Sequence, residues 1–180
     1  MEQSQKQIIW TIGHSTRDWI EFLELLKEFK IDVLADVRSY PGSRKFPHFN
    51  KENLEEILPK KGISYSHFIN LGGRRKPDPD SENTIWRHPS FRAYADYMQS
   101  EDFKNAVTAL QELASEKHVA CMCSEAVWWR CHRSMISDEL MTKDWQVLHI
   151  MGKGKTSEHP FTSPAKVVNG KLVYGLEEKH

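Results

Sequence analysis

Short apolar runs alternate with amphipathic segments over the first 150 residues, and this alternation constrains the fold more than any other feature. Runs at 8–13, 31–37, 62–68, 118–123 and 145–150 have the length and composition of buried strands. Between them, apolar side chains recur every three or four residues, as in helices that bury one face. Strands that alternate with helices form a parallel sheet covered by helices. We therefore predict an α/β fold, a doubly wound three-layer sandwich around a mostly parallel sheet of about five strands.

The expected helices have recognisable start signals. Ser15 precedes Asp18 by the three residues of a capping box, which predicts that the first helix opens there. Polar or aromatic residues open the remaining periodic segments, which are expected to begin at Asn50, Phe91, Phe103 and near Arg130.

The tail after residue 150 has a different pattern. Asn169-Gly170 separates two apolar runs in KVVNGKLVY (166–174), which is a strong signal for a β-hairpin. A length of 180 residues suits one domain. We predict a single α/β domain over 1–180, with a core at 8–150 and a C-terminal hairpin extension at 151–180.

Composition and charge argue against several protein classes. Lys and Arg total 25 and Asp and Glu total 25, so no net charge draws the chain to nucleic acid or membrane. No apolar run approaches the roughly 20 residues that span a bilayer, and the start MEQSQKQIIW lacks the apolar core of a signal peptide. Three cysteines, two of them one residue apart, indicate a reducing compartment. We expect a cytoplasmic protein with no membrane partner.

Polar residues follow the carboxyl ends of four predicted strands, where ligands of doubly wound sheets bind. Two long loops, 38–49 and 70–90, leave from the same edge, and long loops in compact domains are often functional. The strands deliver to this edge His14, Ser15, Asp36, Arg38, Ser39, Tyr40, His67, Asn70, Cys123, Ser124 and Glu125.

Arginines gather at this edge, whereas lysines scatter along the helices and the tail. Of the nine arginines, only Arg92 is expected on a helix face. Arginine binds anions in a bidentate manner better than lysine does, so the edge is predicted to bind an anion. The alternative is that several arginines form solvated salt bridges with acidic loop residues.

The stretch CMCSEAVWWRCHRSM (121–135) holds all three cysteines. Cys121 lies inside a strand and is expected in the core, whereas Cys123 ends the strand, where it is either a nucleophile or core. Cys131, His132 and Arg133 are expected in the first turn of a helix, which favours an anion or a thiolate. Three consecutive helical residues fan over about 200°, so at most two of them can face one ligand.

Several sharper motifs are missing from the sequence. From Cys123 the next arginine comes after six residues, whereas a phosphatase loop requires five. The cysteine spacing does not match a zinc knuckle. GKGKT (152–156) lacks the first glycine of a phosphate-binding loop and is interpreted as a basic surface loop. No glycine-rich dinucleotide fingerprint follows the first strand, so the sequence assigns neither a metal nor a cofactor.

Four motifs together resemble one known family. TIGHS (11–15), DVRSYPGSR (36–44), LGG (71–73) and CSEAVWWRCHRSMIS (123–137) are similar, in this order, to the domain-of-unknown-function family numbered 488. The resemblance spans about residues 8–150 and implies an α/β domain of bacterial and archaeal cytoplasmic proteins, with no established reaction, substrate or cofactor. By position, it marks His14, Ser15, Asp36, Arg38, Cys123, Glu125, Cys131, His132 and Arg133.

We favour an enzyme, a hydrolase or transferase, that acts on a small phosphorylated or nucleotide-like anionic substrate. His14 or Glu125 would transfer protons and Cys123 would be the nucleophile. The predicted substrate-binding residues are Ser15, Asp36, Arg38, Arg44, Arg74, Cys131, His132 and Arg133.

Two alternatives remain open. A nucleic-acid-binding module would use basic and aromatic side chains, namely Arg74, Arg75, Lys76, Arg87, Trp86, Trp128 and Trp129. A metal or redox sensor would use Cys123, Cys131 and either His14 or His132.

Three geometric and chemical expectations follow from the favoured hypothesis. His14, Arg38 and Glu125 should line one pocket, within about 10 Å of each other, as in a ligand cleft. The Glu125 carboxylate should pair with Arg38 or Arg133. The positions of Cys123 and Cys131 should lower their thiol pKa values, so that one of them reacts with an alkylating reagent before Cys121 does.

Overall fold

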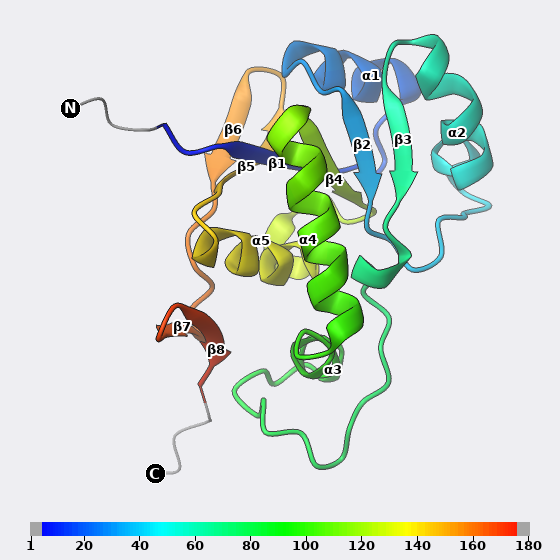
Figure 1. The fold of residues 1–180 in the computed structure, drawn as a ribbon. Coiled ribbons are helices and arrows are strands. Elements are labelled where there is room, and N and C mark those ends of the chain that lie inside the picture. Colours follow the sequence, from blue (N-terminus) through cyan, green and yellow to red (C-terminus); the bar gives the residue numbers. More distant parts are fainter. Residues whose placement is uncertain (1–4, 176–180) are drawn as a thin grey trace.

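The computed structural model describes residues 5–175 and has the doubly wound α/β architecture expected from the sequence (Figure 1). Its main sheet has the strand order β3-β2-β4-β1-β5-β6, with all neighbouring strands parallel except the antiparallel pair β5 and β6. The strands are β1 (Ile8–Gly13), β2 (Val33–Asp36), β3 (Ser64–His67), β4 (Val119–Cys123), β5 (Gln146–Gly152) and β6 (Lys155–Glu158).

Helices cover both faces of this sheet, which makes the three predicted layers. Two helices, α1 (Trp19–Glu28) and α2 (Lys51–Lys60), pack on one face. The other face is covered by α3 (Pro89–Tyr97), α4 (Glu101–Glu116) and α5 (Arg133–Thr142), and Figure 1 shows α4 and α5 in front of the sheet. Short 3-10 turns lie at Pro47–Phe49, Ile69–Leu71 and Trp128–Arg130.

Each strand contributes alternate side chains to the two cores. In β1, Ile9 packs with the core under α3, α4 and α5, whereas Trp10 and Ile12 pack with the core under α1 and α2. This period of two is the geometry of a strand buried on both faces. None of the helices within residues 5–175 combines the length and the apolar character that a membrane span requires.

Two helices begin later than the sequence patterns predicted. Asp18, not Ser15, caps α1, because its carboxylate accepts a hydrogen bond from the Glu21 amide at 2.8 Å. The second difference is at α5, which begins at Arg133 after a separate 3-10 turn. Cys131 and His132 therefore precede the helix instead of lying in its first turn.

The tail confirms one expected hairpin and adds a second. β7 (Ala165–Val168) and β8 (Lys171–Tyr174) pair around Asn169 and Gly170, whose positive φ angles of 52° and 76° suit a two-residue hairpin turn. The interpretation of GKGKT as a surface loop was wrong in part, because its last two residues begin β6, which pairs with β5.

Candidate functional site

A cavity of about 1030 Å³ lies beyond the carboxyl ends of β1, β2 and β4. The expectation that His14, Arg38 and Glu125 line one pocket is met, since all three line this cavity. Of the eleven residues predicted for the site, eight line it, namely His14, Ser15, Arg38, Arg74, Cys123, Glu125, Cys131 and His132. The other three, Asp36, Arg44 and Arg133, lie outside its lining.

The pairing of β1 with β4 brings the first and last motifs of the site together. Gly13 is in register with Cys123, and the amide of His14 donates to the Cys123 carbonyl at 2.9 Å. Ser15 continues the pattern by donating to the Ser124 carbonyl at 3.0 Å, although its φ angle of 48° is left-handed. A Cβ atom at position 13 would overlap the Glu125 carbonyl oxygen, so only glycine lets the 124–125 segment come this close.

Asp36 and Arg38 form a buried ion pair under the cavity wall. The Arg38 guanidinium donates from Nε to Asp36 Oδ1 at 2.9 Å and from Nη2 to Oδ2 at 2.8 Å, and Nη2 also donates to the Phe49 carbonyl at 2.7 Å. Asp36 is fully buried and Arg38 is 8% exposed. Asp36 therefore orients Arg38, and Arg38 is the member of the pair that reaches the cavity.

His14 is held as a neutral imidazole. Its Nδ1 donates to the Ser15 carbonyl at 3.0 Å, and its Nε2 accepts from Arg38 Nη1 at 3.3 Å. Burial, together with the Arg38 charge, lowers the pKa of His14 to about 4. An imidazole with this pKa is not cationic near neutral pH, and its Nε2 lone pair is already taken up by Arg38, which weakens the predicted role of His14 in proton transfer.

Cys123, Cys131 and His132 meet at the floor of the cavity. The two sulfur atoms are 2.7 Å apart, and His132 Nδ1 lies 3.4 Å from Cys131 Sγ. His132 Nε2 donates to the Val37 carbonyl at 2.7 Å. Because a carbonyl only accepts, the proton of neutral His132 resides on Nε2, and its Nδ1 presents a lone pair to Cys131.

The pKa values of the two thiols at the cavity are shifted in opposite directions. Burial raises the pKa of Cys131, but the hydrogen bond from Cys123 and the charge and amide of Arg133 outweigh it, so the pKa of Cys131 lies below its usual value. Burial and the neighbouring Cys131 raise the pKa of Cys123 well above its usual value. The expectation of a lowered pKa was therefore wrong for Cys123 and correct in direction for Cys131, where the cause is local contacts.

Burial also explains the third thiol. Cys121 is 1% exposed, and burial raises its pKa to about 12. This thiol belongs to the core on the α5 side of the sheet, as its position inside β4 predicted.

Glu125 does not form the predicted ion pair. Within residues 5–175 its carboxylate has no cationic partner, and the residue is exposed at the cavity. Arg133 instead donates from Nη2 to the Glu125 backbone carbonyl at 2.9 Å. The reason is that the Arg133 side chain runs beneath the 124–125 segment into the core, where it also reaches Thr11.

The arginines expected at this edge divide into four groups. Arg38, Arg74 and Arg130 line the cavity. Arg133 is buried, Arg44 is exposed outside the lining, and others are engaged elsewhere, such as Arg17 with Glu21. The sequence therefore predicted that the arginines gather at one edge, but of these only Arg38, Arg74 and Arg130 line the cavity.

Several cavity residues were not among the predicted substrate-binding residues. They include Arg130 and Tyr40, which were expected at this edge, and Trp129, which was named for the nucleic-acid alternative; the Tyr40 and Trp129 rings are 72% and 54% exposed. Arg74 lies over the Tyr40 ring at 5.3 Å. Their position in the loops after β2 and β4 was the available signal, since both loops were expected at this edge.

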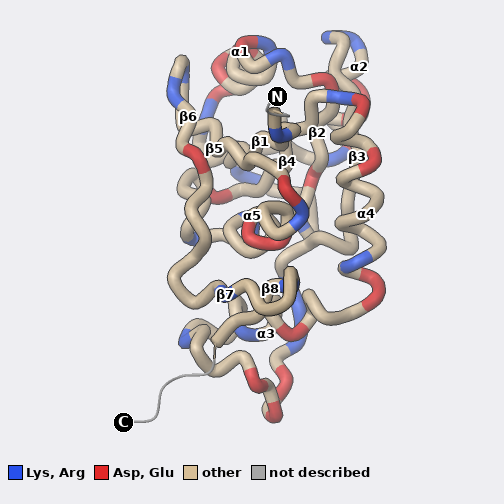
Figure 2. Tube along the Cα trace, turned by 60° about the vertical axis from the view of Figure 1, so that its left-hand side comes forward, with Lys and Arg blue, Asp and Glu red and all other residues tan. Residues whose placement is uncertain are grey.

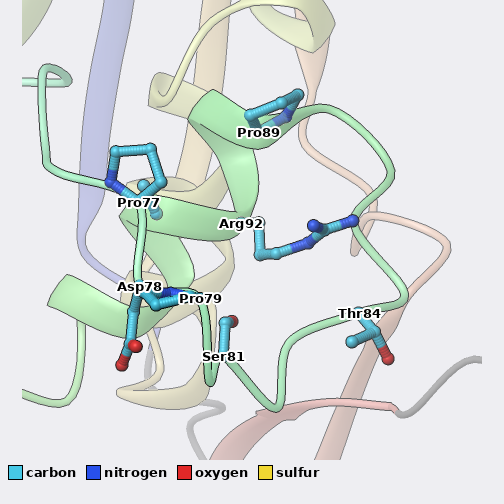
Figure 3. Close-up of a pocket in the computed structure, with 8 residues that line it drawn as sticks. Pro77, Asp78, Pro79, Ser81, Thr84, Pro89 and Arg92 are labelled. Carbon is cyan, nitrogen blue, oxygen red and sulfur yellow. The ribbon is translucent and has the colours of Figure 1, made fainter.

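A second, smaller cavity of about 360 Å³ lies between the 77–84 loop and α3. Figure 3 shows Arg92 extending from α3 toward this loop, with Pro77 and Pro79 on the loop and Pro89 at the start of α3. Arg92 Nε donates to the Trp86 carbonyl at 3.1 Å. The lining holds neither a thiol nor a histidine, so the larger cavity is the candidate site.

The donor set of the larger cavity does not make a metal centre. Among residues 5–175, no three His, Cys, Asp or Glu side chains converge in an arrangement that could hold a metal ion. The metal alternative, which needed Cys123, Cys131 and a histidine as joint ligands, has no geometric support in this part of the chain.

Comparison with known proteins gives one family match. The family model described as "Domain of unknown function DUF488" matches residues 18–140, which is more than half of the chain. No curated protein and no solved structure matches the chain. The matched segment includes Arg38, Cys123, Cys131, His132 and Arg133 and ends within α5.

Proposed function

The chain belongs to the DUF488 family, and from the site described above we propose that it is a thiol-dependent enzyme acting on a phosphorylated or nucleotide-like anionic substrate. The observation that carries this proposal is the environment of Cys131. Cys131 lines the cavity, its sulfur lies beside His132 Nδ1 and the Arg133 amide, and its thiol pKa is lowered. Lowered thiol pKa values are typical of nucleophilic cysteines.

His132 is suited to activate this thiol. Its Nδ1 lone pair lies 3.4 Å from Cys131 Sγ, and the Val37 carbonyl holds the ring through Nε2. A nucleophile, a base and a group that orients the base form the general arrangement of cysteine and serine enzymes. The nucleophile is therefore reassigned from Cys123 to Cys131, whose sulfur contacts the Cys123 sulfur at 2.7 Å.

Arginines and aromatic rings around the cavity suit an anionic, planar ligand. Arg38, Arg74 and Arg130 supply positive charge, and guanidinium groups bind phosphate oxygens in a bidentate manner. Tyr40 and Trp129 are exposed at the same cavity, where an aromatic base can stack on them.

The chemistry expected at this site is nucleophilic substitution at an electrophilic centre next to the anionic group. Cys131 passes its thiol proton to His132 Nδ1, and the resulting thiolate forms a bond to that centre. The leaving group departs with its electron pair and takes that proton from His132. Water or an acceptor molecule then releases the covalent intermediate, which makes the enzyme a hydrolase or a transferase. The Glu125 carboxylate lines the cavity and is free of an ion pair within residues 5–175, so it is placed to accept the proton of the incoming water.

The nucleic-acid alternative fits the contacts less well. Of the three tryptophans it needed, Trp86 packs against Phe91 and Tyr174, and Trp128 stacks on His149, which leaves Trp129 exposed. Figure 2 shows basic and acidic segments interspersed along the trace. Non-specific nucleic-acid binding depends on a continuous basic surface, so a small anionic ligand is favoured.

Protection of Cys131 from alkylation tests the proposal. The purified protein is treated with iodoacetamide at neutral pH with and without a nucleoside monophosphate or inorganic phosphate, and the modified cysteines are identified by peptide mass mapping. We expect the nucleoside monophosphate to slow labelling of Cys131, and Arg74→Gln to weaken this protection. Cys121→Ser serves as the matched control, because Cys121 is buried away from the cavity.

Two results would contradict the proposal. If neither ligand protects Cys131, the cavity does not bind phosphorylated anions. If single-stranded nucleic acid protects the thiol and the mononucleotide does not, with protection lost steeply as salt rises, the nucleic-acid function is the correct one.

A further inference from the structure

Arg133 is a buried cation without a carboxylate in contact. It is 1% exposed, and within residues 5–175 it forms no ion pair. Its guanidinium donates from Nη1 to Thr11 Oγ1 at 3.1 Å and from Nη2 to the Glu125 carbonyl at 2.9 Å, while Nε has no partner. Taking a cation out of water is costly unless other groups compensate its charge, so the structure must supply compensation indirectly.

A continuous chain of hydrogen bonds connects Arg133 with a buried carboxylate. Thr11 Oγ1 lies in contact with His149 Nδ1, and His149 Nε2 lies 2.9 Å from His159 Nδ1. His159 Nε2 lies 2.9 Å from Asp138 Oδ1. Thr11, His149, His159 and Asp138 are each at most 2% exposed. The chain thus passes from β1 through β5 and the segment after β6 to α5.

The carboxylate end of this chain sets the direction of its hydrogen bonds when both histidine rings are neutral. An arginine only donates and an ionised carboxylate only accepts. His159 must then donate from Nε2 to Asp138 and accept at Nδ1 from His149, and His149 must accept at Nδ1 from the Thr11 hydroxyl. In this arrangement both neutral rings carry their proton on Nε2.

The electrostatics agree with this assignment. Burial, with His159 and Arg133 nearby, lowers the pKa of His149 to about 2. A second buried cation within this chain would face the single charge of Asp138 together with Arg133, and unbalanced buried charge is unfavourable. With both rings neutral, the hydrogen-bonded chain has the Arg133 cation at one end and the Asp138 carboxylate at the other.

The C-terminal segment holds the carboxylate end of the chain. Asp138 Oδ1 accepts from the Thr162 amide at 2.9 Å, and Oδ2 accepts from Tyr174 at 2.9 Å and from the Thr162 hydroxyl. Figure 1 shows the β7–β8 hairpin next to α5, where these contacts are made. His149, His159, Thr162 and Tyr174 all lie beyond the matched family segment, which ends at residue 140.

We infer that Thr11, His149, His159 and Asp138 are positioning residues that hold the Arg133 guanidinium beneath the cavity, so that the C-terminal segment is a working part of the thiol site. This inference rests on the proposed function, because Arg133 acts there through Cys131. The Arg133 amide lies 3.5 Å from Cys131 Sγ, and its charge favours the thiolate. A guanidinium that loses the Thr11 anchor is free to move away from that position.

The acidity of Cys131 tests the inference without knowledge of the substrate. The rate of iodoacetamide labelling of Cys131 is measured against pH in the full-length chain by peptide mass mapping. The groups that face this thiol are Cys123 from β4, His132 and Arg133 from α5 and its cap, and Tyr94 from α3.

Thr11→Val removes the hydroxyl that connects His149 with Arg133, and Thr11→Ser keeps it. We expect Thr11→Val to slow labelling of Cys131 at pH 7 by about tenfold, the change for a thiol pKa that rises by about one. Thr11→Ser should retain the wild-type profile. A folded Thr11→Val protein with the wild-type profile overturns the inference.

Two further measurements make the result decisive. If Thr11→Val does not fold, the ¹⁵N chemical shifts of the histidine rings in the wild-type protein decide, since the inference requires neutral Nε2–H forms of His149 and His159 at neutral pH. A cationic ring or an Nδ1–H form overturns it. Arg133→Gln separates the two proposals: an unchanged labelling profile in this variant overturns the proposed activation of Cys131, whereas a changed profile with an unchanged Thr11→Val overturns only the positioning role.

Discussion

Replacement of Asp36 by asparagine tests how strongly the site depends on its buried ion pair. Asp36 is fully buried and accepts hydrogen bonds from the Arg38 amide at 3.1 Å, from two Arg38 guanidinium nitrogens and from Tyr65. Asp36→Asn keeps the shape but removes the charge and turns an amide group toward the guanidinium. Arg38, 8% exposed, is left as a largely buried cation without its partner.

The magnitude follows from burial. Breaking a buried pair by removing one partner costs about 3–5 kcal/mol, because the other charge stays behind. The chain offers a matched control, since Arg17 and Glu21 form an ion pair of the same 2.8 Å length with the Glu21 side chain 50% exposed. Glu21→Gln should cost less than about 1 kcal/mol, because water screens exposed pairs.

Urea denaturation followed by circular dichroism measures both variants. We expect Asp36→Asn to lower the free energy of unfolding by about 3–5 kcal/mol, which is a large part of the roughly 5–15 kcal/mol of a typical domain. The melting temperature should fall by about 6–20 °C, at about 2–4 °C for each kcal/mol in a chain of this size. Equal losses in Asp36→Asn and Glu21→Gln would refute the reasoning, because they would mean that burial does not decide the strength of the Asp36–Arg38 pair.

Three further outcomes are expected. Iodoacetamide at neutral pH should modify Cys131 at least about tenfold faster than Cys123 or Cys121, and equal slow labelling of all three thiols by peptide mass mapping would contradict the assignment of the nucleophile. The pKa of His14 falls from 6.5 to about 4 in the folded protein, so the unfolded chain binds its proton first as the pH falls. Stability should therefore be lost between these two values, by up to about 3 kcal/mol, and His14→Gln should remove this part of the pH dependence in urea denaturation. Gly13→Ala should lower both stability and the labelling rate of Cys131, because its Cβ overlaps the Glu125 carbonyl; a thermal scan and a labelling profile that match the wild type would show that the 124–125 segment moves aside freely.

The fold was predictable because its main determinants are local. Periodicity placed the five parallel strands and five helices, and Asn169-Gly170 identified the C-terminal hairpin. β6 was missed because KTSE is a short polar strand at the sheet edge, with no apolar period to mark it. The start of α1 was misplaced because Ser15 and Asp18 are both good capping residues, and only tertiary contacts hold Ser15 in a left-handed conformation.

The site was predictable in location but not in chemistry. Parallel topology brings strand ends together, so residues such as His14 and Cys123 could be assigned to one edge from sequence order alone. Side-chain direction depends on packing that no local pattern encodes. Arg133 was expected to bind the ligand, yet it turns into the core toward Thr11, and Glu125 is consequently left without the predicted partner. Which thiol is acidic was likewise decided by contacts across the fold.

The buried chain from Thr11 to Asp138 shows a further limit of reading the sequence. Thr11 was noted only as part of TIGHS (11–15), and His149 and His159 were not singled out, because isolated histidines resemble ordinary surface residues. Their connection depends on β1 and β5 lying side by side, with Thr11 in register with His149. If the strand order had been known, the register of β1 against β5 would have predicted the contact between Thr11 and His149.

The central place of β1 in the sheet governs how the chain can reach its native state. Among the strands of this sheet β1 comes first in the sequence, yet its two neighbours are β4 and β5, with Trp10 paired to Ala120 on one side and to Leu148 on the other. Strand pairings between residues so far apart in the sequence form slowly, because the entropy of closing a long loop is lost before the pairing contacts can offset it. Until β5 has left the ribosome, β1 lacks one of its two partner strands. Its apolar residues are then transiently exposed to solvent, which favours aggregation. Nascent chains stalled before residue 145 should therefore depend on a chaperone, whereas chains that include the β7–β8 hairpin and are held on the ribosome by an added C-terminal linker should not.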